Sequence, residues 1–400
     1  MLSKSDKNIT DTIRIFSSHD LTACYLVPTS TGMDKSIMDA TDQVRNFLLS
    51  NKIHNYDLQK QGPENKVKIE ASYVYSDKII PTSISLYRPL TKSGDPRIWF
   101  AKLNEYAQPY NLLALIFHDT QLFIVNTSKD EILKSFDISE SPLKKISNLS
   151  KKEITPTAHE LLIKLKDIAK EGFIPSVRVG DTGIGATLES MLDIKTNSSK
   201  LPDYKGIEIK ASRLAPSSRF GRNRVTLFSQ IPDWKLSKIE SAICLLNKYG
   251  YKNAEGRLQL YCSLDTKKPN SQNLMLKLEE SKDHLLGVHR LNNEDKDLMV
   301  WLIQKLKDRM LEKHPESFWV KAESKIEKNK EFFRYYKVVH TSRPLISNLD
   351  YLFADGTISL DLTLSKKTER TVRDHGYLFK IWPEDFKGLF LNPREYDLLK

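Results

Sequence analysis

Three side chains that could hydrolyse a phosphodiester lie close together between residues 203 and 210. Asp203 precedes Glu208 by five residues, and Lys210 follows Glu208 after one intervening residue. Alternate residues of a strand point to one face, so Glu208 and Lys210 would share a face while Ile207 and Ile209 enter a core. Carboxylate oxygens are the ligands that Mg²⁺ prefers, and a bound cation stabilises the charge of a phosphodiester under attack. The pattern therefore predicts Mg²⁺-dependent hydrolysis, with Lys210 holding the attacking water or helping to deprotonate it.

The surroundings of Glu208 distinguish it from other Glu-x-Lys triplets in the chain. A bare triplet is a weak signal, because it also occurs at four places where a solvated, salt-bridging face is the default interpretation: Glu64/Lys66, Glu280/Lys282, Glu294/Lys296 and Glu323/Lys325. The Glu208 copy lies on an apolar-framed strand, follows Gly206 and has Asp203 upstream. Glu189, on a preceding short helix, could supply a third carboxylate. A structural ion pair is the alternative interpretation.

Cations and hydroxyl groups surround this motif. The basic residues are Lys205, Lys210, Arg213, Arg219, Arg222 and Arg224, and the hydroxyls belong to Ser212, Ser217 and Ser218. A basic loop beside a metal site is what a DNA backbone requires. The segment therefore indicates DNA as the substrate, against the alternative of an ordinary exposed loop.

The motif and its neighbours resemble a known family. The run GDTGIGATLE…PDYKGIEIKASR within residues 180–213 resembles the MvaI/BcnI family of type II restriction endonucleases, whose catalytic domain is similar to the mismatch-repair nickase MutH. The resemblance covers roughly residues 156–400. It implies a PD-(D/E)xK, MutH-like nuclease fold with a central mixed sheet. By that resemblance Asp203 and Glu208 are metal ligands, Lys210 positions the water and Glu189 is an accessory carboxylate.

The same resemblance implies how such an enzyme would act. Family members are monomers that bind double-stranded DNA in a cleft, and their targets resemble CC-N-GG, here CCWGG or CCSGG. A cognate DNA methyltransferase would belong to the same system, with no direct contact implied. Two rival functions remain: a MutH-like strand-nicking endonuclease, and a catalytically silent DNA-binding regulator, against which the intact set of four residues argues.

A second polar segment, residues 368–376, is a candidate for reading bases. Arginine pairs bidentately with guanine and aspartate accepts a hydrogen bond from cytosine N4, so Arg370, Arg373 and Asp374 suit a GC-rich target. His375 could probe the central base pair. The segment resembles the Arg/Asp-His-Gly loop with which the family reads bases. The alternative is a polar hairpin turn whose charges face water.

Composition restricts the class of protein. The 400 residues include 62 Lys and Arg against 51 Asp and Glu, a net charge of +11. Residues 1–150 hold 18 basic and 17 acidic residues, which leaves 44 basic and 34 acidic in residues 151–400. The excess therefore lies in the C-terminal part and favours a polyanionic partner. Three isolated cysteines argue against a disulfide scaffold. No signal peptide or membrane span is predicted, so we expect a cytoplasmic protein.

Hydrophobic periodicity predicts an α/β chain of mixed α+β type with two domains, residues 1–150 and 151–400. In the smaller, N-terminal α+β domain we expect a helix over 34–50 with Asp34 as N-cap, strands at 66–75 and 82–87, a short helix near 98–107 and a hairpin around 118–120. Residues 137–155 should form a linker. In the second domain we expect helices near 157–171, 186–193, 236–249, 294–313 and 343–353, with strands at 206–213, 224–230, 257–264 and 274–289.

The N-terminal domain has one loop with the composition of a DNA contact. Arg88, Lys92, Arg97 and Trp99 cluster in RPLTKSGDPRIWF. An MvaI-like enzyme with an added N-terminal domain is known, UbaLAI, whose domain is a B3-like DNA binder, but this chain has no B3 signature. DNA binding by the N-terminal domain is therefore an analogy of position, and a scaffold or protein-contact role is the alternative.

Overall fold

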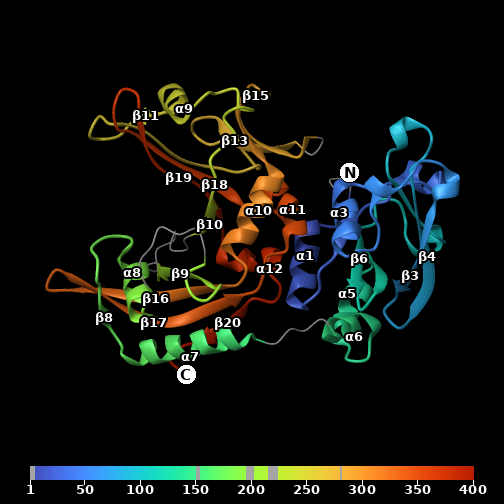
Figure 1. The fold of residues 1–400 in the computed structure, drawn as a ribbon, viewed down its shortest axis with the longest axis horizontal. Helices are drawn as coiled ribbons and strands as arrows, with labels where there is room; N and C mark the ends of the chain where they lie inside the picture. The colour runs from blue at the N-terminus through green and yellow to red at the C-terminus, as the bar shows by residue number, and fades with distance from the viewer. Residues whose placement is uncertain (1–4, 150–153, 195–201, 215–223, 280–281) are drawn as a thin grey trace. The chain divides into compact units, whose positions relative to one another are not determined.

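The chain folds into two compact units, residues 1–153 and 154–400. The structure is a computed structural model, and it describes residues 5–149, 154–194, 202–214, 224–279 and 282–400 (Figure 1). Among the described residues, no helix combines the length and the apolar character that crossing a membrane requires.

The N-terminal unit is built on one seven-stranded sheet, in the order β1-β6-β7-β3-β4-β5-β2. Its strands are β1 Cys24–Leu26, β2 Met38–Asp39, β3 Val67–Val74, β4 Ile79–Tyr87, β5 Arg97–Phe100, β6 Leu113–His118 and β7 Gln121–Asn126. Its helices are α1 Ile9–Ser18, α2 Ser30–Asp34, α3 Asp42–Ser50, α4 Leu103–Tyr106, α5 Asp130–Lys134 and α6 Pro142–Leu149. The strands β3 and β7 are parallel and the other pairs are antiparallel.

Three predictions for this unit are wrong. Residues 34–50 form the end of α2, strand β2 and then α3, whose N-cap is Thr41 and not Asp34. Pairing of β2 with β5 divides the predicted helix, because tertiary pairing outweighs helical periodicity over so short a stretch. The short helix near 98–107 is confined to α4, since β5 occupies its first residues. The predicted linker at 137–155 contains α6, which buries Leu143 and Ile146.

The described residues of the C-terminal unit form three sheets. The central mixed sheet has the order β20-β17-β16-β9, with β8 beside β17; β9 runs parallel to β16 and the other pairs are antiparallel. An antiparallel sheet has the order β10-β19-β18-β12-β11, and β13-β14-β15 form a third. These strands are β8 Ile174–Pro175, β9 Glu208–Arg213, β10 Val225–Ser229, β11 Tyr251–Lys252, β12 Leu258–Leu264, β13 Leu274–Glu279, β14 His284–Leu291, β15 Glu294–Leu302, β16 Ser317–Glu327, β17 Lys330–Thr341, β18 Ser359–Lys366, β19 Val372–Ile381 and β20 Arg394–Asp397.

Two cores meet at the central sheet. The helices are α7 Pro156–Lys170, α8 Gly183–Met191, α9 Ala242–Tyr249, α10 Ile303–Lys313, α11 Leu349–Ala354 and α12 Phe386–Leu389. Strand β16 sends Phe318 and Val320 into the core that α7 and α8 cover, and Trp319 into the core shared with α10 and α12. The alternation follows from the period of two along a strand. The predicted mixed α+β fold with a central mixed sheet is confirmed.

The boundary between β15 and α10 corrects one prediction for this unit. Residues 294–313 were expected to form one helix, but residues 294–302 are strand β15, paired with β14. Asn292 and Asn293 both have positive φ, 52° and 63°, as the two-residue turn of a tight hairpin requires. This Asn-Asn turn is a local signal that the helical interpretation overlooked. The helices predicted at 236–249 and 343–353 are shorter, as α9 and α11, whereas α7 and strands β9, β10 and β12 match their predicted ranges closely.

Candidate active site

Strand β9 positions the central pair of the candidate site. Ile207 and Ile209 are buried, with 1% and 8% of their surfaces exposed, in the core with α7 and α8. Glu208 and Lys210 therefore project from the opposite face, as predicted. Gly206 has a φ of +90° just before the strand, a conformation that glycine adopts without strain. This turn lets the chain enter β9 with Asp203 close behind it.

Glu208 is buried between two lysines. Only 1% of its side chain is exposed, Oε1 lies 2.8 Å from Lys210 Nζ, and Oε2 lies 2.9 Å from Lys313 Nζ. Lys313 is the last residue of α10, and its side chain is 17% exposed against 36% for Lys210. Burial of a carboxylate is costly unless cations compensate its charge. The two lysines supply that compensation, one from the same strand and one from a distant helix.

Two more carboxyl groups lie close enough to this centre for its charges to shift their pKa values. Asp203 Oδ2 accepts a hydrogen bond of 3.0 Å from the backbone N–H of Ile209. Burial, and then the charge of Glu208, raises the pKa of Asp203. Burial, and then the charge of Asp203, raises the pKa of Glu189 on α8, while Arg178 acts in the opposite direction. The fold thus brings together all four predicted residues, which lie on α8, β9 and the turn that leads into β9.

The donor chemistry of these groups fits a hard divalent cation. All the available ligands are carboxylate oxygens, and Glu208 Oε2 is buried without a hydrogen-bond donor, since its contact with Lys313 is an ion pair. Oxygen ligands suit Mg²⁺. Within the described part of the chain, no three or more His, Cys, Asp or Glu side chains converge on one point as a complete metal site. Asp203 and Glu208 are the two carboxylates that the sequence predicts as ligands.

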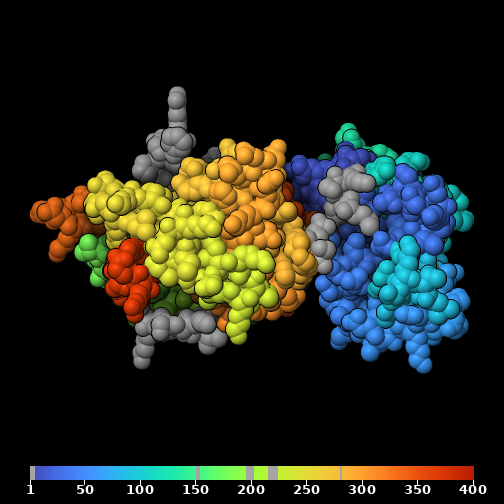
Figure 2. All heavy atoms as spheres, turned by 90° about the horizontal axis from the view of Figure 1, so that it is seen from above, coloured from blue at the N-terminus to red at the C-terminus, as the bar shows by residue number. Residues whose placement is uncertain are grey.

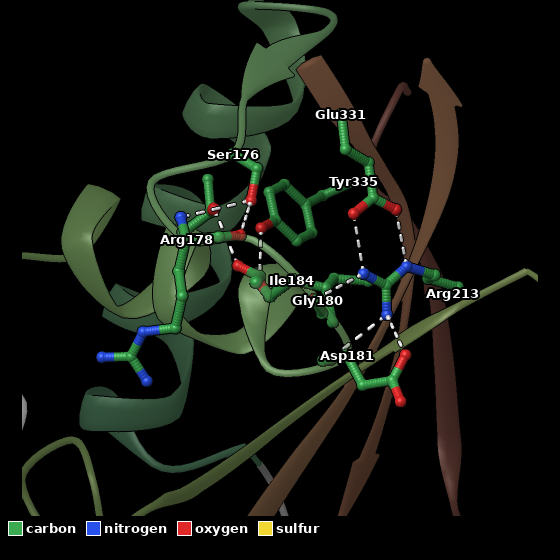
Figure 3. A network of polar contacts seen from close by, with 10 residues as sticks. Ser176, Arg178, Gly180, Asp181, Ile184, Arg213, Glu331 and Tyr335 are labelled. Atoms are coloured by element: carbon green, nitrogen blue, oxygen red, sulfur yellow. Dashed lines mark hydrogen bonds and ion pairs between the residues drawn. The ribbon is translucent and has the colours of Figure 1, made fainter. Parts of the chain in front are cut away.

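Arg213, predicted to contact DNA, is engaged within the protein (Figure 3). Its guanidinium forms two hydrogen bonds with the carboxylate of Glu331, at 2.7 and 2.8 Å. It also donates to the carbonyl oxygens of Gly180 and Asp181, at 3.0 and 3.1 Å, and lies over the Phe333 ring. Arg213 therefore connects the loop before α8 with strand β17, and its donors are already in use.

The same loop is held at several further points. Ser176 Oγ donates to the carbonyl of Arg178 at 2.6 Å, and Tyr335 donates to the carbonyl of Ile184 at 2.8 Å (Figure 3). The Val177 N–H donates to Thr187 Oγ1 at 3.2 Å. These bonds fix the residues that begin α8. Because α8 carries Glu189, the motif GDTGIG positions a carboxylate of the site.

The other predicted phosphate contacts differ in availability. Lys205 is 59% exposed and pairs with Glu160 at 2.8 Å. Arg224 is 21% exposed; it pairs with Asp361 at 2.8 Å and donates to the hydroxyls of Ser263 and Ser359. Arg219 and Arg222 lie outside the described residues. Lys205 thus presents an exposed cation, whereas Arg224 ties β10 to β12 and β18.

The predicted base-reading residues lie on and beside strand β19. Arg370 lies in the turn before β19, and Arg373, Asp374 and His375 are its second to fourth residues; all four are exposed. Among the residues that the structure describes, the side chains of Arg370 and Arg373 have no hydrogen-bond or ion-pair partner. The turn between β18 and β19 reaches the molecular surface (red, beside the yellow part of the same unit, in Figure 2).

A β-bulge sits within the base-reading segment. Leu362 pairs with Tyr377 but Leu364 pairs with Asp374, so β19 contains one extra residue at this point. Gly376 has a φ of +121°, and a Cβ there would lie 2.6 Å from Leu378 Cδ2. Asp374 Oδ1 accepts the Gly376 N–H at 2.7 Å, and the His375 and Tyr261 rings lie perpendicular to each other with centroids 6.4 Å apart. Bulges redirect side chains, so the bulge determines which way His375 and its neighbours point.

Comparison with known proteins shows the family of the chain. A model of the MvaI/BcnI restriction endonuclease family matches residues 162–390, more than half of the chain. The chain belongs to the MvaI/BcnI restriction endonuclease family. It is a site-specific deoxyribonuclease of the type II restriction class, its substrate is DNA, and a metal cofactor is typical of such enzymes. The predicted family and enzyme class are thus confirmed.

A comparison with solved structures matches part of the chain. The restriction endonuclease MvaI bound to its cognate DNA substrate has a TM-score of 0.52 at 22% identity, covering 62% of this chain and 100% of that one. Restriction endonuclease MvaI without DNA has a TM-score of 0.36 at the same identity and coverage. The DNA-bound structure shows a shared fold. A comparison with curated protein sequences finds no match.

In this endonuclease, the loop singled out in the N-terminal unit is largely used by the fold. Arg88 Nε donates to the Gly94 carbonyl at 2.8 Å. Arg97 is 12% exposed and pairs with Asp39, and Trp99 packs against the core of its own unit. Lys92 is exposed. Composition alone could not distinguish cations that brace a loop from cations that face a ligand.

Lys313 is the site residue that sequence reasoning missed. Its position follows from the way α10 ends beside β9, and α10 was predicted as part of a longer helix. Basic residues are common in the last turn of helices. No local pattern therefore marks Lys313 as a partner of Glu208.

Proposed function

We propose that this endonuclease hydrolyses both strands of double-stranded DNA, with Mg²⁺ as cofactor, at a short site resembling CC-N-GG (CCWGG or CCSGG). The observation that carries the proposal is the buried Glu208 between Lys210 and Lys313, with Asp203 and Glu189 close enough to perturb one another. A structural ion pair needs one lysine and no further carboxylates. Two carboxyl groups with raised pKa values, next to a carboxylate that two lysines compensate, are instead typical of a catalytic centre.

Each residue of the centre has a distinct role in the proposal. Asp203 and Glu208 hold the metal; when bound, Mg²⁺ stabilises the charge on the phosphodiester and lowers the pKa of an attacking water. The hydrogen bond from the Ile209 N–H fixes the carboxylate of Asp203. Lys210 is the more exposed of the two lysines, so it positions the water. Lys313 holds Glu208 in place, and Glu189 acts as an accessory carboxylate.

Recognition is assigned to the β18–β19 region and to Lys205. Arg370 and Arg373 are exposed cations without protein partners among the described residues, so both are available for guanine edges. Asp374 suits cytosine N4, and His375 probes the central base pair. Lys205 contacts the phosphate backbone. We assign Arg213 and Arg224 to positioning the protein's own elements, because their donors already serve Glu331 and Asp361.

The test is cleavage of an unmethylated plasmid with the ends mapped. Lys210→Ala or Asp203→Ala should abolish cleavage in Mg²⁺ and leave specific binding in Ca²⁺ largely intact, because each loss removes transition-state stabilisation. The matched control is Lys296→Ala, which alters the exposed Glu294-x-Lys296 triplet on β15 and should cleave normally. Full cleavage by both site variants would exclude the assignment.

The products separate the rival functions. Linear plasmid supports a restriction endonuclease, whereas persistent nicked circles would support a MutH-like strand-nicking enzyme. Specific binding without cleavage by the unaltered chain would support a silent regulator. We further propose that the enzyme acts in the cytoplasm as a monomer and that methylation by a cognate methyltransferase protects its site; sedimentation with DNA and cleavage of methylated plasmids test these points.

A further inference from the structure

The N-terminal unit contains a cavity that the proposed nuclease function does not use. Its volume is about 320 Å³, which lies within the range of small-molecule sites. Strands β1 and β4 line it, together with α2, β2, the start of α3 and the loop that follows β4. All of these elements belong to one compact unit. The cavity therefore exists without any contribution from the nuclease unit.

The walls of the cavity combine flat rings with a polar pair. Tyr25 and Tyr87 contribute aromatic rings, the first buried and the second half-buried. Asp39 and Arg97 are paired neighbours on β2 and β5. The Asp39 side chain is 48% exposed and presents acceptors, and the Arg97 guanidinium that holds it, 12% exposed, lies directly beside them. An acceptor and a donor side by side match the edge of a nucleobase, which presents both.

One residue of the wall has a buried hydroxyl without a partner. Thr41 lines the cavity and is the N-cap residue of α3, but its side chain makes no capping hydrogen bond. Its Oγ1 is buried and has no hydrogen-bond partner among the described residues. Leaving a buried hydroxyl unpaired costs free energy. Rotation of the Thr41 side chain toward a ligand in the cavity would give this hydroxyl a partner and remove that cost.

Two exposed lysines belong to the lining of the cavity. Lys35 and Lys92 both line the cavity, one after α2 and one in the loop after β4. Lysine binds phosphate as a point charge. The cavity thus offers rings for stacking, an edge for hydrogen bonding and cations for a phosphate.

We propose that this cavity binds a single unpaired nucleobase, with the adjoining phosphate at Lys35 and Lys92. The base stacks against Tyr87, its edge meets Asp39 and Arg97, and a polar atom of the nucleotide reaches Thr41 Oγ1. Two sources share this chemistry: a free nucleotide, or a base extruded from DNA. The inference goes beyond the proposed nuclease chemistry and rests on the family's DNA substrate only for the second source.

The test uses the full chain in EDTA, so that no cleavage occurs. Calorimetric titration with each of dAMP, dCMP, dGMP and dTMP measures the free source. A hairpin with 2-aminopurine in a single-nucleotide bulge measures the DNA source, through a change in fluorescence on binding. Saturable binding of a nucleotide, a fluorescence change with the hairpin, or both would support the site and identify its source. Neither signal with the unaltered chain would overturn it.

Substitutions tie the binding to the cavity. Tyr87→Ala should weaken binding about tenfold or more, because stacking on an aromatic ring carries much of the affinity for an unpaired base. Thr41→Val keeps the shape and loses only the hydroxyl, so it should weaken binding about fivefold while the melting temperature stays unchanged or rises. Lys35→Ala should weaken binding and reduce its salt dependence. The matched control Lys68→Ala, on the exposed start of β3, should change neither the binding affinity nor its salt dependence.

The outcomes separate this inference from the nuclease proposal. Plasmid cleavage by the Thr41→Val chain reports on the active site, and binding in EDTA reports on the cavity. Equal binding by the unaltered chain and the Thr41→Val and Tyr87→Ala variants would overturn the cavity assignment, whatever the cleavage result. Loss of cleavage in Asp203→Ala with unchanged nucleotide binding would leave both proposals intact.

Discussion

Replacing Lys313 by methionine should destabilise the nuclease unit and impair cleavage. The change removes one of two cations on a carboxylate that is 1% exposed, while it retains most of the side-chain volume. Glu208 Oε2 would then be a buried charge with no partner, since no other donor among the described residues reaches it. Lys210 would still compensate Oε1 from 2.8 Å. The effect should therefore be large but partial.

The geometry sets the magnitude. Two unit charges 2.9 Å apart attract by about 6 kcal/mol at an effective dielectric constant of about 20, before desolvation is subtracted. Breaking a buried pair typically costs about 3–5 kcal/mol. Because Lys210 remains, we expect Lys313→Met to lower the free energy of unfolding by about 2–3 kcal/mol. Lys305→Met on the same helix is the matched control. Its pair with Asp233 has the same 2.9 Å distance but is 56% exposed on the lysine side, so it should cost less than about 1 kcal/mol.

Urea unfolding of each variant measures the effect. The double variant Lys313→Met/Glu208→Gln should recover most of the lost stability, because neutralising the carboxylate removes the unpaired charge. DNA cleavage should fall in both Lys313→Met and the double variant. Equal stability of Lys313→Met and Lys305→Met, or no recovery in the double variant, would refute the idea that Lys313 compensates Glu208.

Three further predictions concern recognition, modularity and pH. Arg373→Ala should cost about 1–3 kcal/mol of discrimination at one base pair; competition binding with substituted sites checks this, and a uniform loss would mark a phosphate contact. A chain beginning at Ile154 should fold alone and cleave in Mg²⁺, because the four site residues and β19 lie beyond that point; a folded but inactive fragment would show that residues 1–153 complete the site. Burial lowers the pKa of His314 from 6.5 to about 3. Stability should thus fall as pH drops below about 6.5, by about 2 kcal/mol at pH 5. The raised pKa values of Asp203 and Glu189 act in the opposite direction, because they increase stability as pH falls. Urea unfolding of His314→Gln, which has no histidine to protonate at this position, should therefore show how much of the pH dependence of stability comes from His314.

The local geometry of the nuclease centre was predictable from the sequence. Glu208 and Lys210 share a face, and Ile207 and Ile209 enter the core, because side chains alternate along any strand. Asp203 precedes the strand by a short turn at Gly206, so its place follows from chain connectivity. The helix over 157–171 was equally visible, since its apolar residues recur at helical spacing over several turns. These features depend only on residues that are close together along the chain, and the sequence by itself specifies which residues those are.

Contacts between distant segments were decided by the tertiary structure. Lys313 meets Glu208 because α10 ends beside β9, and Arg213 is held by Glu331 because β9 and β17 are two strands of one sheet. Residues 294–302 are a strand because β14 supplies hydrogen-bonding partners that outweigh their helical periodicity. In the N-terminal unit, pairing of β2 with β5 joins Asp39 to Arg97 beside the cavity. The sequence supplies the charged side chains and their spacing along the chain. Long-range packing decides which of these charges meet, because only folding brings their backbones within reach of each other.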